Sequence, residues 1–181
     1  MNDTITLLRA RRSAPPAAMS GPDPTPQEIE ILLAPAARMP DHGKLAPWRF
    51  ILFEGAGRER AGEIFAEIYA KANPGGDDRR VEAERNRFCL APLVVGVISR
   101  AAPQQKILSA GAVCMNLMVA ANALGFASIW LTDWVAYDRA VLARLGVAEN
   151  ERVAGFIHIG RADDPREDRA RPHLADIVTR F

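Results

Sequence analysis

One long apolar segment, residues 107–124, constrains the fold more than any other part of this sequence. It is apolar almost all round and close to the roughly 20 residues with which a helix crosses a bilayer. Asn116 and Asn122 nevertheless lie in its interior, and Lys106 alone gives it little basic flank. We therefore predict a helix buried on every face of a soluble protein rather than a membrane span. Because a small domain can hardly bury a long helix by itself, the segment also predicts a homodimer.

The remaining pattern predicts a sheet with helices between its strands. Three strongly apolar segments, at 93–99, 127–131 and 153–160, are expected to be central strands buried on both faces of a sheet. A segment rich in aromatic and β-branched residues, 48–54, is expected to be a fourth strand. Helical sequence separates them, at 58–72, 78–86, 107–124 and 138–145. This order predicts an α+β fold in which a mixed sheet carries helices on both faces, with the long buried helix at a dimer interface. We expect a single domain spanning residues 1–181, because this length suffices for one core and is short for two.

Local signals define two further helices. The first is expected over about residues 3–10. The second starts at Pro26, because Thr25-Pro26-Gln27-Glu28 has the sequence of a capping box with proline at the first helical position, and Pro35 would kink or end it early. The charged helix at 78–86 is expected on the surface, either as a solvated face or as a lid over a pocket.

Charge and cysteine usage exclude several classes of protein. A net charge of +1 gives no positive field to attract nucleic acid or an anionic membrane, so we expect neither as a partner. Cys89 and Cys114 have no Cys-x-x-Cys spacing, and the three histidines form no short metal motif, so we predict no disulfide and no metal. The N-terminus lacks the apolar core of a secretory signal, which favours a cytoplasmic protein.

Catalytic motifs of the common hydrolases and phosphotransferases are missing from the sequence, which contains no nucleophile elbow, P-loop, paired-carboxylate motif or HExxH. Gly55-Ala56-Gly57 resembles a dinucleotide-binding turn, but Arg60 stands where a third glycine is needed, so a Rossmann fold is disfavoured. This pattern fits an enzyme whose cofactor carries out the chemistry while the protein binds and orients it.

The triplet Arg11-Arg12-Ser13 is the first candidate for such a site. Two adjacent guanidinium groups and a hydroxyl offer fixed hydrogen-bond donors of the kind that hold a phosphate and the polar edge of an aromatic cofactor. An isolated Arg pair after a helix more often serves the last helical carbonyls. The neighbouring motifs change that balance, and they are Arg38, Pro40-Asp41-His42, Pro47-Trp48 and Trp130.

In their order along the chain, these motifs resemble the FMN-dependent nitroreductase-like family, above all its small single-domain NAD(P)H nitroreductases. The matching pieces are Leu7-Leu8-x-x-Arg11-Arg12-Ser13, Arg38-x-Pro40-Asp41-His42, Pro47-Trp48-x-Phe50, the helix 109–124, Gly125-Phe126-x-x-Ile129-Trp130 and Val153-x-Gly155-Phe156-Ile157-x-Ile159-Gly160. The resemblance implies an α+β homodimer with FMN in the interface, where the flavin relays hydride from NADH or NADPH to an acceptor.

The resemblance also implies a set of binding residues. Arg11, Arg12 and Ser13 would hold the FMN phosphate, ribityl chain and pyrimidine edge, and Arg38 and His42 would reach the flavin of the partner subunit. A further cofactor contact is implied for Trp130, Leu131 and Thr132. Nicotinamide nucleotide binding is implied for Ala120, Ala121, Asn122, Ala123, Leu124 and Gly125. No catalytic side chain is expected, because the chemistry takes place at the flavin ring.

Two positions depart from the family pattern. Leu131 stands where close relatives often carry an arginine or another polar residue, which leaves contacts there to backbone groups and the Thr132 hydroxyl. Ala46 replaces a residue that is often glutamine, so one polar contact near the pocket is lost. Trp130 alone has the pattern of an ordinary core aromatic, whereas Trp134 and Tyr137 either line an aromatic substrate pocket or seal the core.

The leading hypothesis is a homodimeric FMN oxidoreductase that takes hydride from NAD(P)H and reduces electron-poor organic acceptors, such as nitroaromatics or quinones, by a ping-pong mechanism. The alternative is a flavin-binding or ligand-carrying module of the same fold without NAD(P)H turnover, and the loss of a polar side chain at Leu131 motivates it.

Overall fold

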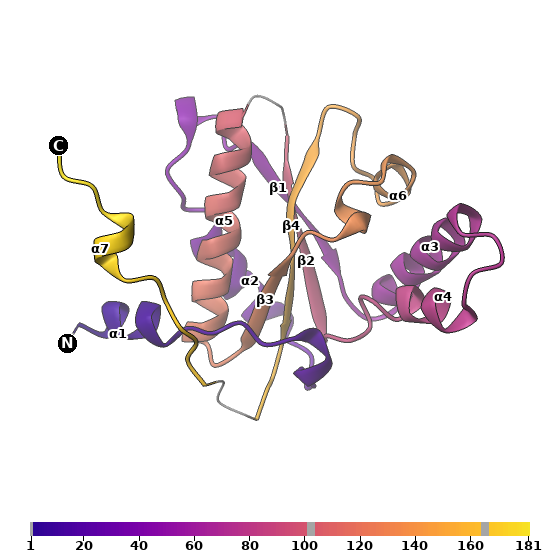
Figure 1. Cartoon of the computed structure of the whole chain (residues 1–181), viewed down its shortest axis with the longest axis horizontal. Coiled ribbons are helices and arrows are strands. Elements are labelled where there is room, and N and C mark those ends of the chain that lie inside the picture. The colour runs from indigo at the N-terminus through magenta and orange to yellow at the C-terminus, as the bar shows by residue number, and fades with distance from the viewer. Residues whose placement is uncertain (1, 101–103, 164–166) are drawn as a thin grey trace.

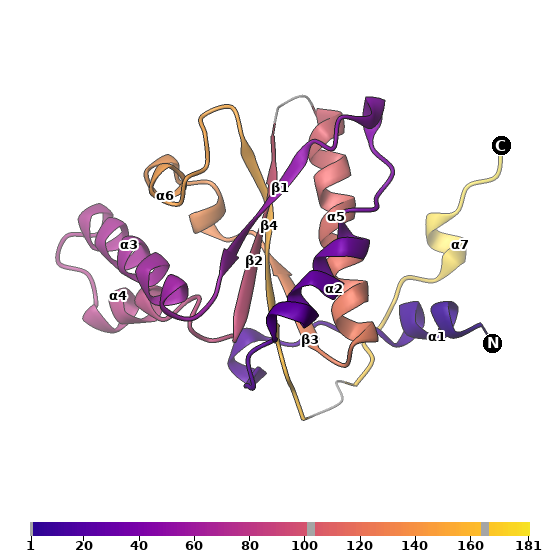
Figure 2. The same ribbon diagram turned by 180° about the vertical axis from the view of Figure 1, so that it is seen from behind.

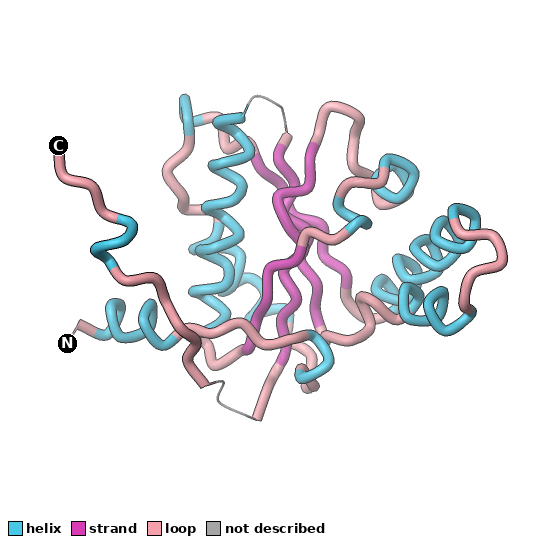
Figure 3. The backbone as a smooth tube through the Cα atoms, viewed as in Figure 1, coloured by secondary structure: helices cyan, strands magenta, loops and turns pink. Residues whose placement is uncertain are grey.

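The computed structural model describes residues 2–100, 104–163 and 167–181, with the side chains of residues 42 and 104–106 left out. A four-stranded sheet forms its centre (Figures 1 and 3). The strands are β1 (Trp48–Phe53), β2 (Leu93–Ser99), β3 (Ala127–Leu131) and β4 (Arg152–Gly160), in the spatial order β1-β2-β4-β3. All four segments that the sequence predicted as strands are therefore confirmed.

Helices cover both faces of this sheet, as the α+β prediction required (Figures 1 and 2). One face carries α2 (Pro26–Ala36) and α5 (Gln104–Ala123). The other face carries α3 (Ala56–Ala72), α4 (Asp78–Arg85) and α6 (Arg139–Arg144). At the side of α5 lie α1 (Asp3–Ala10) and α7 (Leu174–Ile177), away from the sheet. The described residues also form three short 3₁₀ turns, η1 (Pro16–Ala18), η2 (His42–Lys44) and η3 (Trp134–Ala136).

The sheet differs from the expected mixture of strand directions. Each neighbouring pair of strands is antiparallel, and the parallel pairing among the described residues is confined to an isolated bridge between Ser13 and Ser128. The single crossover helix α5 does return the chain in the same direction, so β2 and β3 run parallel. Because β4 inserts between them, these two strands are not neighbours.

The period-two pattern of the central strands divides the core into two layers. On β2, Leu93, Val95 and Val97 pack with α2 and α5, whereas Val94 and Ile98 pack with α3 and α6. Each of these side chains is almost fully buried. The sheet is therefore held by a hydrophobic layer on each side.

The N-terminus of α2 has the capping geometry that its sequence predicts. The Thr25 hydroxyl accepts a hydrogen bond from the Glu28 backbone N–H at 3.2 Å, and the Glu28 carboxylate accepts one from the Thr25 backbone N–H at 2.8 Å. The helix ends at Ala36, one residue after Pro35, whose ring and missing N–H disrupt the hydrogen bonding of the preceding turn.

Helix α5 is buried on its sheet side, while its outer side exposes apolar groups. Ala110, Cys114 and Leu117 are fully buried, whereas Leu108 is 68% and Met115 38% exposed. Burial on every face, as the sequence predicts, would thus require a second chain. None of the helices in the described residues combines the length and hydropathy needed to cross a membrane.

One sequence-based expectation about burial is wrong. Strand β3 was expected to be buried on both faces, but it is an edge strand with Trp130 38% exposed. Helix α4 lies on the surface as expected, with Arg79, Arg80 and Glu82 exposed. Glu84 within it is nevertheless only 1% exposed, because Arg87 and Trp134 supply hydrogen bonds that allow a carboxylate to be buried.

Candidate functional site

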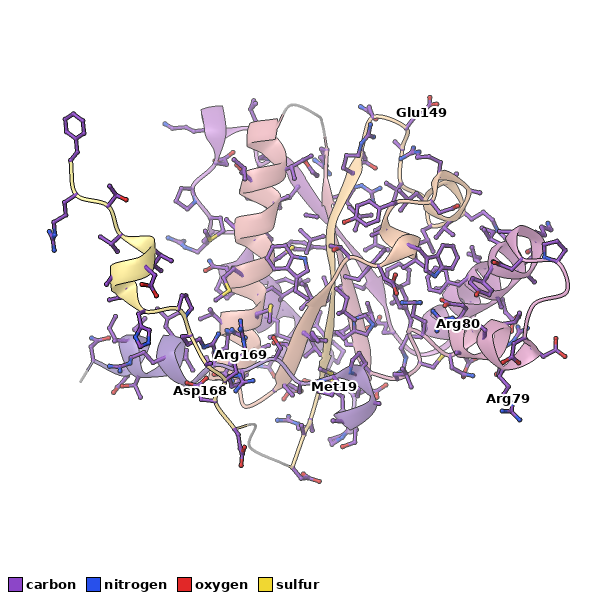
Figure 4. All side chains as sticks on the ribbon, in the orientation of Figure 1. Met19, Arg79, Arg80, Glu149, Asp168 and Arg169 are labelled. Atoms are coloured by element: carbon purple, nitrogen blue, oxygen red, sulfur yellow. The ribbon has the colours of Figure 1, made fainter. Side chains whose placement is uncertain are left out.

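A cluster of arginines gathers where the two ends of the chain meet. Arg11 and Arg12 directly follow α1, and Arg169 and Arg171 come from the segment before α7. Figure 4 labels Asp168 and Arg169, which lie against this end of α1. A cavity of about 320 Å³ opens here, lined by Leu8, Arg9, Arg11, Asp168 and Arg171.

The arginines of this cluster hold hydrogen-bond donors that the described residues leave unused. Nε and Nη1 of Arg11 and Nη1 of Arg12 are buried without a hydrogen-bond partner there. Burial lowers the pKa of Arg11, and the nearby charges of Arg171, Arg12 and Arg169 lower it further. Because these Arg11 nitrogens do not bond the last carbonyls of α1, the simple helix-capping explanation of the Arg pair is disfavoured. Buried cationic donors without hydrogen-bond acceptors are suited to binding an anion such as a phosphate.

Asp168 is an acidic residue that faces this arginine cluster. Its Oδ1 atom lies 3.5 Å from Nη1 of Arg12 and 3.2 Å from Nη2 of Arg171. A hydrogen bond from the Arg169 backbone N–H lowers the pKa of Asp168, and Arg171 adds to the effect. The side chain is 67% exposed, so solvent screens its ion pair with Arg12. A bound anion would therefore displace this carboxylate at little cost.

Ser13 connects the arginine cluster to the edge strand β3. It forms a parallel bridge with Ser128, and the Ala14 backbone N–H donates to the Ser128 carbonyl at 3.2 Å. Backbone groups along a strand alternate between its two edges, so the N–H and C=O of Trp130 face the same outer edge as those of Ser128. The triplet and residues 130–132 thus lie along one edge of the sheet, with about 7 Å between Ser128 and Trp130.

The Trp130 side chain packs across β4 instead of entering the core. Its Nε1 donates to the Ala154 carbonyl at 3.0 Å. A Cβ atom on Gly155 would lie 2.0 Å from this nitrogen, so the indole occupies space that only glycine leaves open. Leu131 is half-buried beside it, and the exposed Thr132 follows at the end of the strand.

A cavity of about 520 Å³ begins at Trp130 and Thr132. The first half of α5 forms one wall, with Ile107, Leu108 and Gly111, while Tyr137 and Arg152 lie among the residues on the other sides. The two aromatic residues considered for a pocket have different roles. Tyr137 lines the cavity and is 65% exposed, whereas Trp134 packs in the core against Phe65 and Tyr69.

A network of buried charges fixes the turn that follows Thr132. The Glu84 carboxylate accepts hydrogen bonds from Arg87 Nε at 2.7 Å and from Trp134 Nε1 at 2.9 Å. Nη1 of Arg87 donates to Asp133 at 2.6 Å, and the other Asp133 oxygen accepts the Trp134 backbone N–H at 2.7 Å. Helix α4 therefore holds η3, which forms part of the cavity wall through Ala136.

Arg38 and His42 lie apart from the arginine cluster. Arg38 is exposed just after α2, and His42 begins η2, although its side chain lies outside the described residues. Figures 1 and 2 show η2 at the N-terminal end of α5 and the Arg11 segment near its C-terminal end. A helix of 20 residues is about 30 Å long, so His42 in η2 lies far from Arg11 within one chain. The end of α2 before Arg38 lies against the middle of α5, where Asn116 Nδ2 donates to the Pro35 carbonyl at 3.0 Å.

The segment proposed for a nicotinamide nucleotide closes α5. Ala121 is fully buried and Asn122 half-buried, while Gly125 adopts a φ of 75° and ends the helix. This is the negative end of the helix dipole, where a phosphate is not favoured. The assignment of Ala120, Ala121, Asn122, Ala123, Leu124 and Gly125 stays a prediction.

Sequence reasoning missed several residues of this region. Arg169 and Arg171 belong to an arginine-rich tail, and nothing in its sequence indicates that it lies beside α1. Arg152 begins an apolar strand and looked like an ordinary flanking charge. Glu84 belongs to a helix whose composition indicated only solvent exposure, and Arg87 follows that helix.

Comparison with known proteins gives consistent results. Residues 8–161 match the sequence profile of the Nitroreductase family. An Escherichia coli (strain K12) protein named "Putative NAD(P)H nitroreductase YdjA" is 32% identical over 164 residues, covering 87% of this chain and 87% of that protein. A nitroreductase-like family protein from Bacillus cereus superposes with a TM-score of 0.85 at 20% identity, covering 100% of this chain and 97% of the other.

One further solved structure is that of the FMN-dependent nitroreductase NfnB from Mycobacterium smegmatis in complex with NADPH. It superposes with a TM-score of 0.78 at 21% identity and covers 99% of this chain and 98% of its own. At such identities the two structural likenesses confirm the fold class.

Proposed function

Because this chain belongs to the nitroreductase family, we propose that it is an FMN-dependent oxidoreductase that takes hydride from NADH or NADPH and reduces an electron-poor organic acceptor, such as a nitroaromatic or a quinone. The observation that carries the proposal is the set of buried guanidinium donors on Arg11 and Arg12 that find no hydrogen-bond acceptor among the described residues. FMN ends in a phosphate, which is the kind of acceptor these donors fit.

In this proposal the residues of the chain bind and orient the cofactor. Arg11 and Arg12 hold the phosphate, and Ser13 meets the cofactor beside Ser128. The outward backbone groups of Trp130 and the hydroxyl of Thr132 lie further along the same edge, where they meet the polar edge of the flavin ring. When bound there, FMN would supply the hydride-transfer chemistry, which accounts for the lack of an obvious catalytic side chain.

A homodimer completes the proposed site. His42 lies too far from Arg11 within one chain, and a second subunit with its α5 against this α5 would supply Arg38 and His42 to the flavin. Apolar groups at the exposed side of α5, α1 and α7 support this arrangement, and they include Leu108, Met115, Ile5, Leu8, Leu174 and Ile177. Patches of this kind commonly mark interfaces between proteins.

A second candidate is a flavin-binding or ligand-carrying module of the same fold without NAD(P)H turnover. Leu131 favours it, because this half-buried aliphatic residue supplies no side-chain donor where relatives often have a polar group. The protein would then keep its flavin oxidised in the presence of NAD(P)H.

The visible absorption spectrum of the purified protein tests these proposals. It is recorded before and after NADH, and then NADPH, is added without oxygen. A flavin band that bleaches and recovers on addition of a nitroaromatic or quinone is the expected result. Bound flavin that stays oxidised would favour the carrier, and a protein that binds no flavin even after incubation with FMN would refute both.

A further inference from the structure

Arg152 is the one charged residue among the described residues that line the 520 Å³ cavity beside Trp130. The other walls are mostly aliphatic or aromatic, with Leu108, Val153, Trp130 and Tyr137 among them. The volume lies within the range typical of small-molecule sites, which combine apolar walls with a few polar groups.

The Arg152 guanidinium is anchored at one nitrogen and otherwise available. Nη1 donates to the carbonyls of Glu149 at 2.8 Å and Glu151 at 2.7 Å. The Glu151 carboxylate is held by Arg49 at 2.6 Å, and none of the ion pairs among the described residues includes Arg152. The Nε and Nη2 groups are thus left to donate to a ligand, in the planar geometry that matches a carboxylate.

This cation is separate from the arginines assigned to the cofactor phosphate. Arg152 stands at the start of β4, whereas the Ser13 and Ser128 bridge lies beside Ile159 near the other end of that strand. Seven residues of strand correspond to roughly 20 Å. Figure 4 shows the same separation, since Glu149, just before β4, and Asp168 lie at opposite ends of the sheet. Arg152 therefore cannot serve the same anion as Arg11 and Arg12.

The elements occur in a fixed order along the sheet edge. The arginine cluster comes first, Trp130 and Thr132 follow, and the cavity with Tyr137 and Arg152 comes last. A planar molecule in this cavity would have aromatic side chains beside it and a cation at one end. Its reducible group would face Trp130 and Thr132, where the proposed flavin ring lies.

We propose that this cavity is the acceptor site and that Arg152 selects planar aromatic acceptors that carry a carboxylate. This inference rests on the proposed function and adds a substrate class to it. With 4-nitrobenzoate the reaction consumes one NAD(P)H and one proton from solvent, reduces the nitro group by two electrons to nitroso, and releases NAD(P)⁺ and one water.

The test compares 4-nitrobenzoate with 4-nitrobenzamide, a neutral acceptor of nearly the same shape. For each protein, the ratio of the two kcat/KM values isolates the effect of the substrate charge. The unaltered protein should prefer the carboxylate, and added salt should weaken the preference. Arg152→Gln should lower the ratio about tenfold, in line with the loss of one partly solvated charge-assisted pair.

Three controls make the result specific. Arg139→Gln removes an arginine that donates to the Ala148 carbonyl in the same loop but does not line the cavity, and it should leave the ratio unchanged. Arg152→Lys keeps the charge and should retain part of the preference, which also covers the case in which the glutamine variant does not fold. Thermal melts and the flavin band are measured for each variant.

The outcomes separate this inference from the proposed function. If the unaltered protein reduces both nitroarenes with equal kcat/KM, or if Arg152→Gln leaves the ratio unchanged, the inference is wrong while the function stands. If Arg152→Gln loses its flavin, the cavity belongs to the cofactor and the inference is also wrong. If neither compound is reduced at all, the proposed function itself fails.

Discussion

Replacement of Glu84 by glutamine should lower the free energy of unfolding by about 3 kcal/mol. The carboxylate is 1% exposed and is bonded by Arg87 and Trp134, with Arg80 3.5 Å away. An amide at this position keeps one oxygen acceptor, but its NH₂ group is brought toward groups that are themselves donors. The variant therefore leaves part of the network unsatisfied as well as uncharged.

The expected loss of unfolding free energy depends on which partners Arg87 keeps in the Glu84→Gln variant. Breaking a buried ion pair by removing one charge typically costs about 3–5 kcal/mol. Arg87 keeps Asp133 at 2.6 Å, and its side chain is 18% exposed, so we take the lower end of that range. In a chain of this length, 1 kcal/mol corresponds to about 2–4 °C in Tm, so the melting temperature should fall by about 6–12 °C.

Equilibrium denaturation in urea, with a thermal melt in parallel, measures the effect. Glu82→Gln is the matched control, because Glu82 is on the same helix and pairs with Arg85 while 59% exposed. The Glu82→Gln variant should lose less than about 1 kcal/mol of unfolding free energy. Equal stabilities of the Glu84→Gln and Glu82→Gln variants would refute the reasoning, since they would show that the buried network contributes no more than a surface pair.

Three other variants test separate parts of the molecule. Arg12→Ala should weaken FMN binding by about 1.5–3 kcal/mol through loss of a charge-assisted bond, and unchanged flavin retention in a titration would contradict the phosphate assignment. Burial lowers the pKa of His158 to about 4, so the folded state binds fewer protons than the unfolded state between about pH 6.5 and 4, and stability should fall by up to about 3 kcal/mol as the pH drops through that window. Denaturation at several pH values should show this loss reduced in His158→Leu, and an identical pH dependence would argue against it. Gly155→Ala should displace the Trp130 indole, lower Tm and reduce flavin affinity, and a variant with unaltered melting would show that the indole can move freely.

The elements of this fold were predictable wherever the signal is local. The strand segments have apolar runs, and Thr25 with Glu28 forms a capping box within four residues, so both could be located without tertiary information. Such runs cannot distinguish a central strand from an edge strand. The position of β3 at the edge depends on β4, which comes later in the chain and inserts between β2 and β3.

The candidate site was predictable only in part, because much of it depends on distant contacts. Arg11, Arg12 and Ser13 stand next to each other and form a motif. Glu84 is buried by Trp134, which lies 50 residues further along the sequence, and the composition of α4 does not indicate that contact. The arginines at 169 and 171 become informative only when the tail is seen to return to α1.

The arginine cluster joins two parts of the chain that are synthesised at very different times. Arg11 and Arg12 are translated before any strand of the sheet, whereas Arg169 and Arg171 are translated only after all four strands. No complete anion site exists on the nascent chain before that point. If this cluster holds the cofactor phosphate as proposed, FMN meets its complete site only after all four strands of the sheet have been translated.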